Sequence, residues 1–187
     1  MRRYILACAG LLACCICSIG GGASKANAAG NAGRVAQQHE SAIAWLGGQI
    51  RSYQSATWRW DRLMGVPRVQ TEGRTLQEMS IPDIQRAVRL WEQRAIEARR
   101  KAQDPPHKAA WLCIHHYEGS WTDGGAPYYG GLQMDLGFQH TYAPWLLRAK
   151  GTADHWTPLE QIWTAEKAAK SRGFWPWPNT ARFCGLI

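Results

Sequence analysis

The sequence predicts a mainly α-helical protein, in which an α-helical hairpin precedes a small α+β domain with a short β-hairpin. Two long stretches before residue 107 repeat apolar residues at three- and four-residue steps, as one face of a helix requires. Beyond residue 107 the helical stretches are shorter, and a glycine-rich aromatic segment separates them. With 45% hydrophobic and 19% charged residues, the 187-residue chain is too apolar to be disordered.

Residues 1–28 have the organisation of a secretory signal peptide. The start is basic, and the apolar run over 4–19 is shorter than the ~20 residues that span a bilayer. Ala26-Asn27-Ala28 has the small-x-small pattern of a signal-peptidase site, which predicts cleavage before Ala29. The alternatives are an uncleaved N-terminal anchor and a lipoprotein with its lipid on Cys14. We expect a soluble, secreted mature protein that does not bind the membrane.

Removal of this peptide changes the cysteine count and the charge. Four of the six cysteines leave with it, so only Cys113 and Cys184 remain. Two cysteines in an exported protein predict one disulfide, and two buried free thiols are the alternative. Loss of Arg2, Arg3 and Lys25 lowers the formal charge from +8 to +5, which suits an anionic polymer but is common in soluble proteins. No basic run is dense enough to predict nucleic-acid binding.

Residues 29–107 form the predicted helical N-terminal region. The first five, 29–33, are Ala, Gly and Asn, and we expect them to be disordered. A helix is predicted over 34–63, with Gly47-Gly48 as a candidate kink and Gly65-Val66-Pro67 as its end.

A second helix follows a loop over 66–79. Ser80 is a suitable N-cap, and Asp104-Pro105-Pro106 ends the helix after about Gln103. Two helices joined by a loop predict an antiparallel hairpin. No spacing of residues in this region is typical of catalysis. We therefore interpret it as a structural appendage, or as a binding surface through its arginine-rich face.

Residues 108–187 form the second predicted region, with seven of the 11 tryptophans and both remaining cysteines. A helix is predicted over 108–118, and the segment 128–134 predicts a short extended element or β-hairpin. Helices are predicted over 138–149 and 157–172, and the second of these begins with a capping box.

Glu118 is the residue of this region with the clearest chemical role. It ends a predicted helix, Gly119-Ser120-Trp121 follows it, and a glycine-rich aromatic strand then ends in Gln133. Aromatic rings bind the apolar C–H faces of sugars, and a carboxyl group among apolar side chains is desolvated, which favours its protonated form. A neutral carboxyl can protonate a glycosidic oxygen, so this arrangement indicates a glycosidase acid. A solvated helix-terminal glutamate beside core tryptophans is the alternative.

Several short motifs of residues 108–187 occur in the order and spacing of a known family. They are Trp111, Glu118-Gly119-Ser120-Trp121, Tyr128-Tyr129-Gly130-Gly131-Leu132-Gln133, Glu160-Gln161-Ile162, Ala165-Glu166, Gly173, Trp177-Pro178 and Cys184. On these motifs, about 80 residues resemble the catalytic domain of the resuscitation-promoting factors of actinobacteria. That domain is a compact relative of lysozymes and lytic transglycosylases.

The resemblance implies a lysozyme-like domain in which Glu118 is the general acid. Its substrate would be the β-1,4 bond between N-acetylmuramic acid and N-acetylglucosamine, so the partner is the peptidoglycan glycan strand and the location is the cell wall. The resemblance also implies that Tyr129 and Gln133 lie in the substrate cleft. It implies Glu160 and Glu166 as helix residues rather than catalysts.

Two departures from the family stand out. The family usually has a cysteine immediately before the catalytic glutamate, where this chain has Tyr117. Because Cys113 lies four residues earlier on the same helix face, a disulfide to Cys184 can be kept with a shift of one turn. The loop between Glu118 and Tyr128 is about three residues shorter than in the family, so the family's loop contacts are not carried over.

The remaining candidates are polar and aromatic residues near Glu118. Trp121 and Asp123 are candidate substrate-binding residues, and Asp123 or Asp135 is a candidate second carboxylate. Without a second carboxylate, breaking the glycosidic bond would leave an oxocarbenium ion that water or the substrate's own oxygen attacks. Attack by water gives hydrolysis, and attack by the substrate's oxygen gives a 1,6-anhydro product. His115 and His116 point apart on a helix, so we expect no metal and no cofactor. A non-catalytic wall-binding or signalling protein on the same fold is the alternative function.

Overall fold

The structure is a computed structural model that describes residues 24–68 and 75–187. Its fold is mainly α-helical with a small two-stranded antiparallel sheet, which confirms the predicted fold class. Residues 1–23, with most of the predicted signal peptide and Cys14, lie outside the described residues. Within the described part, no helix combines the length and the apolar character needed to cross a membrane. Residues 42–187 form one compact unit, and the described residues up to Ser41 belong to another.

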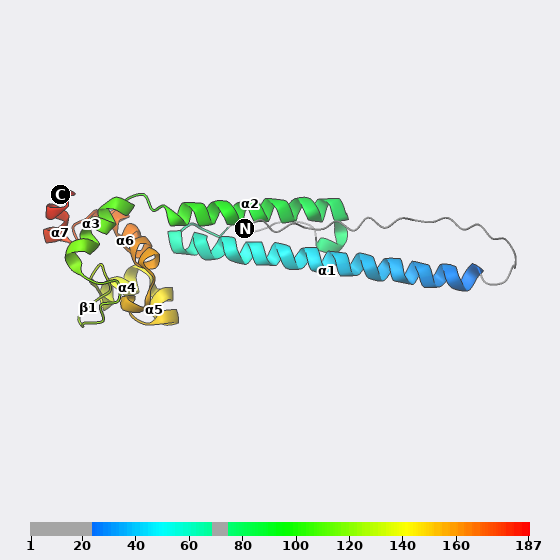
Figure 1. Cartoon of the computed structure of the whole chain (residues 1–187), viewed down its shortest axis with the longest axis horizontal. Helices are drawn as coiled ribbons and strands as arrows, with labels where there is room; N and C mark the ends of the chain where they lie inside the picture. The colour runs from blue at the N-terminus through cyan, green and yellow to red at the C-terminus, as the bar shows by residue number, and fades with distance from the viewer. Residues whose placement is uncertain (1–23, 69–74) are drawn as a thin grey trace, which may run out of the picture. The chain divides into compact units, whose positions relative to one another are not determined.

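The first helix, α1 (Ser24–Met64), is continuous (Figure 1). It includes residues 29–33, so the prediction of disorder there is wrong, although two of these five residues are glycines. Gly47-Gly48 does not interrupt the helix either. A Cβ atom at Gly47 would lie 2.6 Å from Cδ1 of Leu76, so this glycine lets the following segment pack closely against α1.

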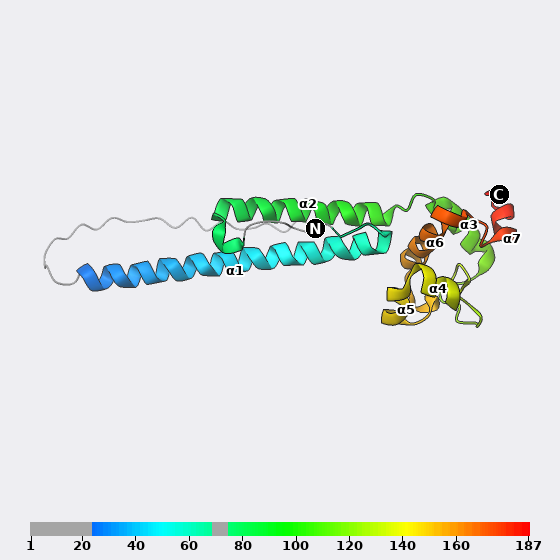
Figure 2. The same cartoon turned by 180° about the vertical axis from the view of Figure 1, so that it is seen from behind.

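The second long helix, α2 (Ile81–Gln103), runs beside the C-terminal part of α1 and completes the predicted hairpin (Figures 1 and 2). A short 3-10 turn, η1 (Leu76–Glu78), precedes it. Ser80 is the N-cap, as predicted, because its Oγ accepts a hydrogen bond from the Asp83 amide at 3.3 Å. Apolar side chains from both helices form the hairpin core. They are Leu46, Ile50, Ile84, Val88 and Trp91.

Residues 108–187, a part of this unit that we call the C-terminal domain, have short helices around a two-stranded sheet. In chain order the elements are α3 (Lys108–Glu118), β1 (Tyr128–Tyr129), β2 (Met134–Asp135), α4 (Leu136–Tyr142), α5 (Pro144–Lys150), η2 (Ala153–His155), α6 (Pro158–Arg172) and α7 (Pro178–Phe183). The strands pair antiparallel, with Tyr128 opposite Asp135 and Tyr129 opposite Met134. Both strands are therefore part of one tight hairpin, as the sequence predicted.

Two features of this domain differ from the sequence prediction. The single helix predicted over 138–149 is two helices, α4 and α5, because Pro144 has no amide hydrogen with which to continue α4. The last helix, α7, was not predicted; it is only six residues long, and Pro178 occupies its first position.

Most tryptophans of the C-terminal domain have a structural role in its core. Trp111 is fully buried and Trp177 is 5% exposed, and their rings meet edge to face with centroids 5.1 Å apart. The Trp177 indole donates a hydrogen bond to the Leu132 carbonyl at 2.6 Å. This contact fixes the start of α7 against the β-hairpin, so the core positions the last helix.

The hairpin is joined to α6 by a second apolar cluster around Trp163. Leu63 and Met64 of α1 and Ala102 of α2 pack on this ring. The Trp163 indole also donates a hydrogen bond to the Ala102 carbonyl at 2.7 Å. Nearby, the His107 amide donates to Oε1 of Glu166 at 2.8 Å, and Glu166 is 4% exposed. Glu166 therefore anchors the segment between α2 and α3.

Lys167, beside the end of α1, should destabilise the folded state at neutral pH. Burial lowers the pKa of its ammonium group to about 8, and repulsion from Lys170 and Arg62 adds to the effect. The ordinary pKa in the unfolded chain is higher, so stability rises with pH from about 8 to 10.5 as the folded state loses this proton first. Lys167→Met should gain about 1 kcal/mol at pH 7, a value discounted for partial exposure.

Urea unfolding of both proteins at pH 7 and at pH 10.5 checks this prediction. The difference between the two free energies of unfolding should shrink at the higher pH, because other groups titrate equally in both proteins. If the difference between the two free energies of unfolding is the same at both pH values, the charge of Lys167 does not destabilise the folded state.

Candidate active site

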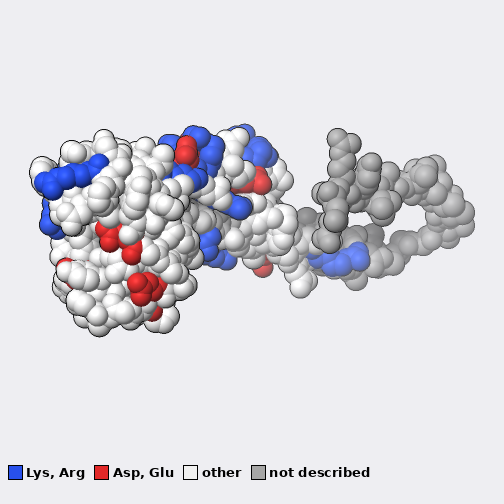
Figure 3. All heavy atoms as spheres, turned by 60° about the vertical axis from the view of Figure 1, so that its left-hand side comes forward, with Lys and Arg blue, Asp and Glu red and all other residues white. Residues whose placement is uncertain are grey.

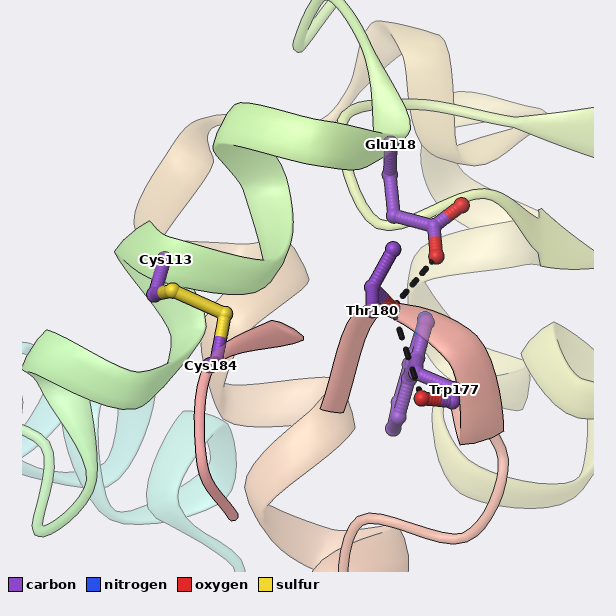
Figure 4. Close-up of a disulfide and its surroundings, with 5 residues drawn as sticks. All are labelled: Cys113, Glu118, Trp177, Thr180 and Cys184. Atoms are coloured by element: carbon purple, nitrogen blue, oxygen red, sulfur yellow. Dashed lines mark hydrogen bonds between the residues drawn. A yellow bond between two sulfur atoms is a disulfide. The ribbon is translucent and has the colours of Figure 1, made fainter. Parts of the chain in front are cut away.

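Glu118 is the last residue of α3, and its side chain is half-buried. Gly119 ends the helix with a φ of +142°, a conformation that favours glycine, and its amide donates back to the His115 carbonyl. The chain therefore turns away immediately after Glu118. Figure 4 shows the Glu118 carboxylate directed at Thr180 of α7, whose hydroxyl donates to Oε1 at 2.8 Å.

The predicted disulfide between Cys113 and Cys184 is formed, with the Cα atoms 6.0 Å apart (Figure 4). Cys113 lies on α3 five residues before Glu118, and Cys184 follows α7 four residues after Thr180. The bond therefore holds the two helices that supply the carboxyl group and its hydroxyl partner.

The Thr180 hydroxyl lies between two acceptors. Besides Oε1 of Glu118, it lies 3.3 Å from the Trp177 carbonyl, and Thr180 is 8% exposed. A hydroxyl has one hydrogen to donate and can also accept. It can donate to an ionised Glu118, or accept from a protonated one while donating to the Trp177 carbonyl. The site therefore accommodates both protonation states of the carboxyl group.

Asp123 and Gln133 form a hydrogen-bonded pair next to Glu118. The Gln133 amide nitrogen donates to Oδ2 of Asp123 at 2.8 Å, and Oδ1 of Asp123 accepts from the Gly125 amide at 3.1 Å. A Cβ at Gly119 would lie 3.6 Å from both Asp123 Oδ2 and Gln133 Nε2. The pair therefore borders the residue that follows Glu118, and both Asp123 oxygens already accept hydrogen bonds.

Gln133 has a left-handed backbone with a φ of 46°, which is uncommon outside glycine. This conformation costs about 1 kcal/mol or more, and such residues are often found at functional sites. It occurs at the turn of the β-hairpin, where it directs the side-chain amide toward Asp123.

Gln161 of α6 supports the loops around this pair. It is fully buried, and its Oε1 accepts from the Gly131 amide at 2.8 Å. Its Nε2 donates to the carbonyls of Trp121 and Ala153, each at 2.8 Å. Gly130 approaches Gln161 so closely that no Cβ atom fits between them. One buried amide therefore fixes both the loop after Glu118 and the β-hairpin.

The aromatic candidates differ in accessibility. Trp121 is half-buried and stacks on His115 with centroids 3.8 Å apart, so one face of its ring is covered. Tyr129 is half-buried and packs on the domain core. Tyr117, next to Glu118, is 54% exposed and contacts Phe183, which is 71% exposed, with centroids 5.6 Å apart. Two exposed rings therefore lie on the helices that supply Glu118 and Thr180, although the sequence did not single out this pair.

The other titratable candidates have structural contacts. Asp135 caps α4, because its Oδ1 accepts from the Phe138 amide at 2.7 Å. Glu160 completes the capping box of α6 with Thr157 and accepts from Lys150. Across residues 24–68 and 75–187, no three His, Cys, Asp or Glu side chains form a group suited to a metal ion.

Comparison of the chain with protein-family models, with curated proteins and with solved structures finds no match in any of the three. The structure brings Asp123 and Gln133 together beside Gly119, the residue that follows Glu118. It adds Thr180, for which the sequence held no signal, and Gln161, which was only part of a motif.

Thr180 should act as a positioning residue for Glu118. Thr180→Val keeps the shape of the side chain and removes the hydroxyl, so we expect any Glu118-dependent activity to fall about tenfold with little loss of stability. Thr180→Ser should restore most of the activity because it restores the hydroxyl. Turnover and thermal unfolding measured for all three proteins check this. Equal losses in the Val and Ser proteins would contradict a role for the hydroxyl.

Proposed function

We propose that the protein is a secreted enzyme that cleaves peptidoglycan glycan strands at the β-1,4 bond between N-acetylmuramic acid and N-acetylglucosamine. One observation carries the proposal: the half-buried Glu118 carboxyl accepts a hydrogen bond from Thr180, on the two helices that also carry the exposed rings of Tyr117 and Phe183. A carboxyl group held in one orientation suits acid catalysis on a sugar. The motifs shared with the resuscitation-promoting factors support the same reaction.

Glu118 acts as the general acid in this reaction. With Thr180 bonded to Oε1, Oε2 is the oxygen that gives its proton to the glycosidic oxygen. The bond between that oxygen and the anomeric carbon breaks, and the leaving sugar departs as an alcohol. The ionised Glu118 then takes a proton from the oxygen nucleophile that attacks the oxocarbenium ion. Water as the nucleophile gives hydrolysis, and the 6-hydroxyl of the same sugar gives a 1,6-anhydro product.

Asp123 and Gln133 are proposed to bind substrate rather than to carry out a proton transfer. Both Asp123 oxygens accept hydrogen bonds, from Gly125 and Gln133, so this carboxylate is already paired. The hydrogen-bonded pair borders Gly119. Its side-chain oxygens have further lone pairs, which we propose accept hydrogen bonds from sugar hydroxyls. Trp121 and Tyr129 are also proposed to bind substrate.

Export to the cell wall is part of the proposal. The Cys113–Cys184 disulfide is typical of oxidising compartments outside the cytoplasm. The predicted signal peptide accords with this location.

Release of soluble fragments from insoluble, dye-labelled peptidoglycan tests the proposal. The protein of residues 29–187 should release dye over time, whereas the heat-denatured protein should not. Fragment masses then separate the two outcomes of the reaction, because a hydrolysed end is heavier than an anhydro end by one water. Binding to the wall without release of fragments would contradict an enzyme and favour a wall-binding protein.

A further inference from the structure

A second candidate site lies away from Glu118, in a cavity of about 580 Å³. Side chains of α1 and the segment after it line one part, and Trp145 of α5 lines another. Three arginines and two tryptophans dominate the lining. They are Arg59, Arg62, Arg68, Trp58 and Trp145. The cavity is therefore both cationic and aromatic.

The arginines of this cavity are held by rings rather than by carboxylates. The Arg62 guanidinium lies 4.5 Å from the ring centroid of Trp145, and the Arg68 guanidinium lies 3.5 Å from that of Trp58. Stacking of this kind orients a guanidinium and leaves its in-plane N–H groups free to donate. Within residues 24–68 and 75–187, no ion pair involves Arg59, Arg62 or Arg68.

The tryptophans add two further donors. The indole nitrogens of Trp58 and Trp145 are buried and have no hydrogen-bond partner in the described part of the chain. A buried N–H group without a partner costs free energy, which a ligand with acceptor oxygens would recover. The cavity therefore offers guanidinium donors, and two indole N–H groups without a partner lie buried in side chains that line it.

The charge around the cavity also favours an anion. Asp61 is the one acidic residue of the lining; burial raises its pKa, and Lys101 opposes that rise. Lys167 adds a further cation close to Arg62, as the lowering of its pKa by that arginine indicates. On the face in Figure 3, Lys and Arg atoms gather toward the helical hairpin, whereas the C-terminal domain is mostly uncharged.

We propose that this cavity, which we call the arginine–tryptophan pocket, binds a saccharide that carries an oxyanion, either a carboxylate or a phosphate. The guanidinium donors match the acceptor oxygens of such a group. A guanidinium covers one face of each indole ring. The pocket therefore suits an oxyanion better than a nucleobase, which would need a free ring face on which to stack. The site is separate from Glu118, and its occupation does not depend on cleavage.

Titration of ¹⁵N-labelled protein of residues 29–187 tests this inference. The probes form two matched pairs: N-acetylmuramic acid against N-acetylglucosamine, and glucose 6-phosphate against glucose. Trp58→Phe and Trp145→Phe proteins assign the two indole N–H signals. We expect an acidic sugar to move both signals and its neutral partner to move neither. If only N-acetylmuramic acid moves the signals, the pocket binds a carboxylate. If only glucose 6-phosphate moves them, it binds a phosphate.

A variant with both Arg62→Gln and Arg68→Gln should bind the acidic sugar at least tenfold more weakly. Arg89→Gln, on an exposed part of α2 outside the lining, is the matched control and should bind normally. Equal affinity in the double variant and the control would overturn the proposal. So would immobile Trp58 and Trp145 signals at millimolar concentrations of both acidic sugars, or tighter binding of an oligothymidylate at the same signals.

Discussion

Glu118→Gln should lower the rate of peptidoglycan cleavage by about a thousandfold. The amide has the shape of the carboxyl group, and its oxygen can still accept the Thr180 hydrogen bond, but it has no acidic proton to give to the glycosidic oxygen. Removal of a general acid typically costs 10²–10⁴ in rate, about 3–5 kcal/mol of transition-state stabilisation. Initial rates of dye release from insoluble peptidoglycan, at equal protein concentration, measure the effect.

Glu40→Gln is the matched control, because it makes the same chemical change at an exposed position of α1. Its rate should equal that of the unchanged protein. Thermal unfolding should show that both variants remain folded, and pull-down with insoluble peptidoglycan should show that both still bind. A Glu118→Gln protein that releases dye at the normal rate would show that another group supplies the proton.

Gln161→Leu should cost about 3–5 kcal/mol of unfolding free energy. Leucine has a similar volume but leaves the Gly131 amide without its acceptor and the Trp121 and Ala153 carbonyls without their donor. Each buried polar group left without a partner costs about 1–3 kcal/mol. Because these groups belong to the loop after Glu118 and to the β-hairpin, activity should fall even where the protein is still folded.

Urea unfolding followed by circular dichroism measures this loss. Gln103→Leu is the control, because Gln103 is exposed at the end of α2, and it should change stability by less than about 0.5 kcal/mol. Similar stabilities of the two variants would mean that the Gln161 hydrogen bonds contribute little to the fold.

Local signals explain why much of the fold could be predicted from the sequence. Ser80 and Asp104 mark the ends of α2, and Thr157 begins α6 with its capping box. All residues of such a cap lie within three or four positions of one another, so the complete pattern can be recognised in the sequence. The short α7 has no comparable pattern, and contacts of Trp177 with Trp111 and the Leu132 carbonyl hold it in place.

The candidate site could be predicted only in part, for the same reason. Glu118 ends a helix before a glycine, and that local pattern is plain in the sequence. Its partner Thr180 lies 62 residues away, on the helix that was not predicted. The role of Gln161 likewise depends on three segments that meet only in the folded chain. Long-range hydrogen bonds leave no periodicity or spacing in a single sequence.

Mass spectrometry of peptide-free glycan strands, incubated with the protein of residues 29–187, tests the central claim most directly. Removal of the peptides leaves the β-1,4 linkages as the bonds to be cleaved. The account predicts shorter strands with new N-acetylmuramic acid ends, hydrolysed or anhydro, and none with the Glu118→Gln protein. Strands of unchanged length after prolonged incubation with folded, disulfide-bonded protein would contradict it, as would equal cleavage by both proteins.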